Sequence, residues 1–142
     1  MKYEYMKRFE PENYTIHTFD YWVVLLRKRQ VTLGSVIVAL RREVPSFSMV
    51  SVEEFAELSN VFSWYEKTIK KLYGAEKFNY IAAMMKDNFV HFHAFPRYSN
   101  TILRYGMEWK DVYWPGAVEL APVITEKVKL DKIYSDFISA DR

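Results

Sequence analysis

The amino-acid sequence predicts an α+β domain built on an antiparallel sheet. Two apolar, β-branched segments come first, a long amphipathic helix follows, and two further strand-like segments come after the helix. This order of strands and helix is typical of α+β proteins. A chain of 142 residues fits one compact domain, so we expect a single domain over residues 1–142.

The first two strands are predicted at residues 21–27 and 35–40. Both segments are continuous apolar runs rich in aromatic or β-branched residues, a composition that favours buried strands. Gly34 lies between them and can adopt the backbone angles that a turn needs. We therefore expect the two strands to form a hairpin.

A long helix is predicted after this hairpin. Ser51 and Glu54 have the spacing of a capping box, in which each side chain accepts a hydrogen bond from the backbone N–H of the other residue. Gly74 is expected to end the helix. Apolar residues spaced by three and four form one stripe, which comprises Phe55, Leu58, Phe62, Tyr65, Ile69 and Leu72.

Two more strands are predicted at residues 77–84 and 90–95. Pro96 is expected to end the second of them, because proline cannot donate a hydrogen bond to a sheet. Residues 97–116 have the composition of a loop. A short amphipathic C-terminal helix is expected from about Thr125.

The composition excludes several classes of protein. A net charge of +2 is too close to neutral for stable nucleic-acid binding to be expected. No segment approaches the roughly 20 apolar residues needed to cross a bilayer, and the polar residues 1–15 lack the apolar core of a signal peptide. We therefore expect a cytoplasmic protein with no membrane partner. The absence of cysteine excludes disulfides, thiolate metal ligands and cysteine nucleophiles.

Two of the three histidines, His91 and His93, lie two residues apart in a predicted strand. Side chains at this spacing point to the same face of a sheet, so both imidazoles should project together, with Val90, Phe92 and Ala94 on the opposite face. A neutral imidazole is a good nucleophile toward phosphorus, and its ordinary pKa of about 6.5 leaves it mostly unprotonated at pH 7. On spacing alone, a pair of structural histidines bonded to backbone groups remains an equal alternative.

Arg97 follows this strand directly. Its guanidinium can bind phosphate through two parallel hydrogen bonds. A salt bridge at the end of the strand is the alternative role for the same side chain, and the sequence leaves both open.

Residues 88–98, with the sequence NFVHFHAFPRY, resemble the signature of histidine triad (HIT) proteins. In that signature three histidines alternate with apolar residues, and the branch that contains dinucleoside polyphosphate hydrolases often continues into Pro-Arg. Further segments occur in the expected order at residues 32–35, 41–42, 51–54, 78–80 and 106–116. The resemblance implies a HIT-like sheet of about five strands, with its core over about residues 15–116 and a C-terminal segment over residues 117–142.

The same resemblance implies roles for individual residues. His91 corresponds to the middle histidine, which attacks the α-phosphorus of a nucleotide and forms a transient nucleotidyl-histidine. His93 corresponds to the third histidine and is expected to contact phosphate, while Asn79 and Arg97 are expected to help bind the nucleotide. Phe89 occupies the first histidine position of the nucleotide site, where it either removes a polar contact or narrows the pocket. The aromatic ring cannot carry a proton.

The resemblance predicts a nucleotidyl hydrolase or transferase that acts on nucleoside phosphates such as diadenosine polyphosphates. It also implies a homodimer formed through the long helix and an adjoining strand. No cofactor is required, although a magnesium ion on the substrate's phosphates is compatible with the reaction.

Two other functions remain open on the sequence. A nucleotide-binding or sensing protein without turnover is suggested by the phenylalanine in the triad. A metal site on His91 and His93 is the second alternative, and it would need a further ligand from His17, Asp87 or Asp111.

Overall fold

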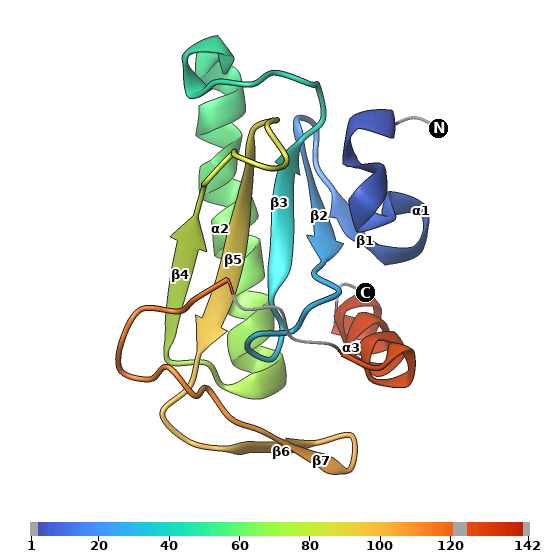
Figure 1. Ribbon diagram of the computed structural model, residues 1–142, viewed down its shortest axis with the longest axis vertical. Coiled ribbons are helices and arrows are strands. Elements are labelled where there is room, and N and C mark those ends of the chain that lie inside the picture. Colours follow the sequence, from blue (N-terminus) through green and yellow to red (C-terminus); the bar gives the residue numbers. More distant parts are fainter. Residues whose placement is uncertain (1–2, 121–124, 141–142) are drawn as a thin grey trace.

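The chain forms a five-stranded antiparallel sheet with its longest helix packed across one face (Figure 1). The structure is a computed structural model that describes residues 3–120 and 125–140. Its elements in chain order are the 3₁₀ helix η1 (Glu4–Phe9), α1 (Pro11–Tyr14), β1 (Thr15–Thr18), β2 (Trp22–Leu26), β3 (Val36–Leu40), the 3₁₀ helix η2 (Phe47–Met49), α2 (Val52–Tyr73), β4 (Lys77–Ile81), β5 (His91–Arg97), β6 (Ile102–Arg104), β7 (Met107–Trp109) and α3 (Lys127–Ala140).

The strands of the sheet are ordered β1-β2-β3-β5-β4, and each neighbouring pair is antiparallel. In the central pair, Ala39 of β3 lies opposite His91 of β5, and Ile37 lies opposite His93. The predicted α+β class, antiparallel sheet, long helix and C-terminal helix are therefore confirmed.

Helix α2 begins and ends where local signals in the sequence place its ends. The Ser51 hydroxyl accepts a hydrogen bond from the Glu54 backbone N–H at 3.1 Å, and the Glu54 carboxylate accepts one from the Ser51 backbone N–H at 2.8 Å. Gly74 ends the helix with a φ of +72°, a value that glycine adopts without strain. Phe55 was predicted on the buried stripe, but it is 43% exposed because it lies in the first turn, at the edge of the contact with the sheet.

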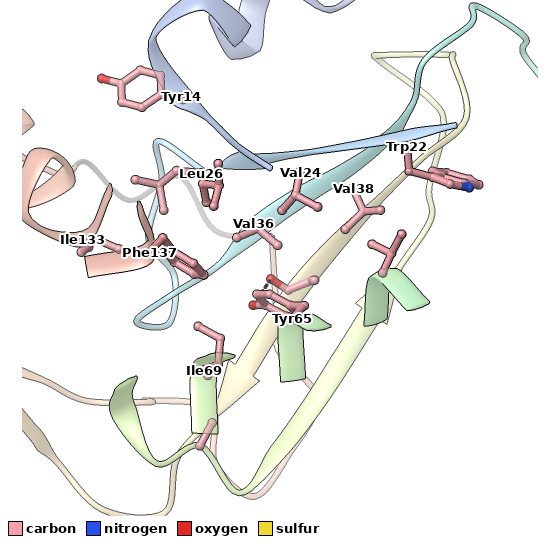
Figure 2. Packing of buried hydrophobic residues seen from close by; sticks show 14 of the residues in the cluster. Tyr14, Trp22, Val24, Leu26, Val36, Val38, Tyr65, Ile69, Ile133 and Phe137 are labelled. Carbon is pink, nitrogen blue, oxygen red and sulfur yellow. Dashed lines mark hydrogen bonds between the residues drawn. The ribbon is translucent and has the colours of Figure 1, made fainter. Parts of the chain in front are cut away.

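The main core lies between the sheet and the two long helices (Figure 2). Alternate residues of β2 and β3 face α2, and the C-terminal helix adds Ile133 and Phe137 to the same cluster. Both of these α3 side chains are fully buried. The core therefore extends beyond residues 15–116, and the C-terminal segment is an integral part of it.

Several predicted boundaries were wrong. Pro96 does not end β5 but pairs with Phe78 of β4. The pairing of β3 with β5 stops at Ala94, so β4 alone lies alongside β5 at the proline, and proline is tolerated at such an edge. The strand predicted over residues 77–84 ends at Ile81. Residues 97–116 include the β6–β7 hairpin in place of the expected loop.

No helix within the described residues is long and apolar enough to cross a membrane. The cytoplasmic location stays a prediction.

Candidate active site

A cavity of about 580 Å³ lies on the face of the sheet opposite α2. The imidazoles of His91 and His93 line it together, as their spacing on β5 predicted. Phe92 and Ala94 pack on the α2 face instead. The alternation of side chains along β5 therefore separates two polar rings from the main core and places both in one cavity.

A main-chain carbonyl fixes the tautomer of His91. The Nδ1 atom of His91 lies 2.7 Å from the carbonyl oxygen of Phe89. Because a carbonyl oxygen can only accept a hydrogen bond, Nδ1 carries the proton and Nε2 of the neutral ring holds a lone pair. Burial lowers the pKa of His91, against opposing contributions from the Phe89 carbonyl and Asp87. The ring is therefore neutral at pH 7 and has an unprotonated Nε2.

His93 has the opposite tautomer. The Nε–H of Arg27 donates to Nδ1 of His93 at 3.3 Å, so the proton of the neutral His93 ring lies on Nε2. Burial, then the charges of Arg27 and His91, lower the pKa of His93 to about 3. The two imidazole centroids are 5.0 Å apart. The cavity thus has a lone pair on His91 next to an N–H donor on His93.

The side chain of Phe89 lies outside this cavity. Its ring is 3% exposed and belongs to a second hydrophobic cluster, formed by Met6, Val23, Leu25, Ile37, Ala39 and Phe89. Phe89 is not among the residues that line the cavity, because its ring packs under the N-terminal segment. This packing favours the expected loss of a polar contact over a narrowing of the pocket, and a contact with nucleotide stays a prediction. The residue contacts His91 through its carbonyl oxygen and through its ring, whose centroid lies 4.7 Å from that of the imidazole.

The N-terminal 3₁₀ helix η1 covers this part of the sheet. Tyr5 contacts the Phe89 ring edge-to-face at 5.1 Å between centroids. Phe9 lies 5.8 Å from the His91 ring and lines the cavity. Arg8 forms an ion pair with Asp87 at 2.8 Å, which ties η1 to the loop before β5. The position of η1 beside the cavity could not be predicted from the sequence, because this segment is short and polar and has no hydrophobic periodicity.

Arg97 and Asn79 are separated from the histidine pair. The Arg97 guanidinium donates to Asp111 at 2.6 Å, to Asn79 Oδ1 at 2.6 Å and to the carbonyl of Gly116 at 2.7 Å. Arg97 is 4% exposed and lines a different cavity, together with Asn79. The structure therefore favours the salt-bridge role of Arg97 over the phosphate-binding one, and neither residue lines the cavity of His91.

Three other cationic residues line the histidine cavity, and together they form its cationic wall. Arg27, Lys28 and Arg29 follow directly after β2 and all line the cavity. Lys28 forms an ion pair with Glu10. The run Arg-Lys-Arg after a buried strand was the signal in the sequence that could have identified this wall.

Two of the three other residues considered for a metal site lie outside the histidine cavity. His17 packs against Phe19 and Trp64, with ring centroids 4.4 and 4.9 Å away. Asp111 is bound to Arg97. Of the three additional ligands proposed from the sequence, only Asp87 lines the histidine cavity, and it is paired with Arg8.

Comparison with solved structures shows that the chain has the fold of histidine triad proteins. A histidine triad protein from Marinobacter aquaeolei matches with a TM-score of 0.73 and 19% identity, over 94% of this chain and 92% of that one. One from Sinorhizobium meliloti matches with a TM-score of 0.73 and 18% identity, over 94% and 93%. A diadenosine triphosphate hydrolase from Plasmodium falciparum matches with a TM-score of 0.67 and 12% identity, over 90% and 76%. No protein-family model and no curated protein sequence matches the chain.

The packing of Phe89 predicts that a histidine at this position destabilises the protein. Phe89→His replaces a buried ring with a polar one in an apolar cluster, so we expect the free energy of unfolding to fall by at least about 2 kcal/mol. Phe89→Leu keeps the site apolar and should cause a smaller loss. Urea denaturation of both variants measures the difference. Equal stability of Phe89→His and the wild type would contradict the packing described.

Proposed function

We propose that the protein is a nucleotidyl hydrolase or transferase that acts on nucleoside phosphates through a covalent intermediate on His91. The observation that carries this proposal is the hydrogen bond from His91 Nδ1 to the Phe89 carbonyl, which leaves Nε2 with a lone pair in a cavity lined by cations. The fold shared with histidine triad proteins supports it.

In the proposed first step, the lone pair of His91 Nε2 forms a bond to the α-phosphorus. The bond from phosphorus to the leaving-group oxygen breaks, and that oxygen keeps the electron pair. His91 then bears phosphorus on Nε2 and a proton on Nδ1, so the ring is cationic. The Phe89 carbonyl accepts its hydrogen bond from this cation and stabilises it more strongly than the neutral ring.

In the second step a water molecule, or an acceptor hydroxyl in a transferase, attacks the same phosphorus and releases its proton to the solvent. The electron pair of the Nε2–phosphorus bond returns to His91, which regains its original tautomer. Throughout, the Nε2–H of His93 can donate to a phosphoryl oxygen, and the cationic wall stabilises the negative charge of the phosphates. The scheme uses no cofactor, and magnesium on the substrate's phosphates is compatible with it.

A nucleotide-binding protein without turnover is the second candidate. Phe89 motivates it, because the first triad position has no side-chain donor or acceptor for the leaving group. Binding and turnover assays on the same preparation separate the two candidates.

We expect wild-type protein to release mononucleotide from diadenosine polyphosphates and to acquire the mass of one nucleotidyl group after rapid acid quench. His91→Gln should lower turnover by more than about a thousandfold, since it removes the nucleophile. His17→Gln is the matched control, because His17 lies outside the cavity and should leave turnover and adduct unchanged. Saturable nucleotide binding with neither product nor adduct in the wild type would instead identify a binding protein.

The lowered pKa of His91 predicts where activity is lost in acid. Protonation removes the lone pair of the nucleophile, and a lowered pKa means that protonation occurs only at lower pH. The acidic limb of kcat/KM should therefore lie below the ordinary histidine value of about 6.5. Asp87→Asn removes a carboxylate that raises this pKa, so the limb should move further toward acid, whereas Asp131→Asn on α3 should leave it in place. A limb above 6.5 would contradict this assignment.

We also propose a homodimer. Strand β4 lies at an edge of the sheet, and within the described residues only β5 pairs with it. A second copy that adds its own β4 at this edge would extend the sheet across both chains. Light scattering should give twice the 17.0 kDa of one chain. A monomer mass at all accessible concentrations would exclude it.

A further inference from the structure

Arg27 is a partly buried cation whose protein contacts are all uncharged. Its Nε–H donates to Nδ1 of His93 at 3.3 Å, and Nη1 donates to the main-chain carbonyl of Arg29 at 2.6 Å. The guanidinium carbon lies 5.3 Å from the centroid of the Phe95 ring. These contacts fix the position of the charge without compensating it.

No carboxylate among residues 3–120 and 125–140 forms an ion pair with Arg27. Asp87, the one carboxylate lining the cavity, is held by Arg8. Burial, with a smaller contribution from Arg29, lowers the pKa of Arg27 to about 10, so the side chain stays charged at neutral pH. An uncompensated cation in a partly buried site is costly to the folded state.

The turn after Arg27 has a second support besides the hydrogen bond from the guanidinium to the Arg29 carbonyl. The turn after Arg27 is held by Gln30, whose amide donates to the carbonyls of Arg27 and Ser35 and accepts from the N–H of Gly34. These bonds involve the main chain of Arg27 and leave its guanidinium out. The positive charge of Arg27 is therefore not needed for these bonds of Gln30 and is available to an anionic ligand.

On the basis of the function proposed above, we propose that Arg27 binds a second anionic group of the substrate, so that the site selects compounds carrying two phosphates over nucleotides carrying one. The first phosphate lies at His91, and Arg27 donates a hydrogen bond to the neighbouring His93, whose ring centroid is 5.0 Å from that of His91. Nη2 of Arg27 makes no hydrogen bond to the described residues and remains available, and a guanidinium fork matches the geometry of a phosphate. The second phosphate can be the next one in the same chain or one on the sugar.

Binding of three adenosine ligands to the purified full chain tests this inference by calorimetry. AMP carries one phosphate, α,β-methylene-ADP carries a second in an uncleavable chain, and adenosine 3′,5′-bisphosphate carries a second on the sugar. We expect wild type to bind at least one of the latter two about tenfold or more tightly than AMP, the gain typical of a charge-assisted hydrogen bond. The ligand that shows the gain identifies the source of the second phosphate.

Arg27→Gln should reduce this preference to about onefold. Arg29→Gln is the matched control, since it removes the same charge from an exposed position on the same wall. It should weaken the binding of all three ligands while the preference for two phosphates over one is retained. Thermal unfolding checks that Arg27→Gln is folded, and we expect its midpoint to equal or exceed that of the wild type because an uncompensated charge is gone. Arg27→Lys keeps the charge without the fork and should give an intermediate preference.

Equal affinities for all three ligands in the wild type, or a preference that survives in Arg27→Gln, would overturn the role of Arg27 and leave the proposed function standing. A preference lost equally in Arg29→Gln would also overturn it, because the effect would then be general electrostatics. Failure of all three ligands to bind the wild type would overturn the proposed function together with this inference.

Discussion

The antiparallel pairing of β3 with β5 is the constraint on which the site depends. It places Ala39 opposite His91 and Ile37 opposite His93, with small or aliphatic side chains beside both imidazoles. A shift of this register by one residue would turn both rings into the core against α2 and bring Phe92 to the cavity. The burial of Phe92 and its neighbours on the α2 face therefore holds the histidines in place, although none of these core residues lies in the cavity.

The sequence predicted those parts of the fold whose signals are local. The capping box of Ser51 and Glu54 and the glycine at position 74 fix the ends of α2 through contacts within a few residues. The β6–β7 hairpin and the 3₁₀ helix η1 were missed, because both are short and neither has a clear hydrophobic period. Met6 of η1 is buried in a cluster with residues of β2 and β3 and with Phe89, all of them distant in sequence, and no local pattern encodes these contacts.

The same distinction applies to the site. The period of two along β5 predicted that His91 and His93 share a face, but it could not say what else lies on that face. The ion pair of Arg8 with Asp87 joins residues 79 positions apart in the chain. Arg97 lies close to the histidines in sequence, yet its side chain is held by Asp111 and lines a different cavity. Proximity in sequence was thus a poor guide to the residues that surround the reacting group.

The main chain and the side chain of Phe89 have different roles in the structure. The tautomer of His91 depends on the main-chain carbonyl of residue 89, which any amino acid supplies. The side chain at this position instead packs against Tyr5 and Phe9 and so holds η1 over the sheet. In the reaction proposed above, phenylalanine at this position keeps the carbonyl that fixes the tautomer of His91, and its ring packs against the imidazole with 4.7 Å between centroids. The same ring offers no side-chain hydrogen bond to a leaving group.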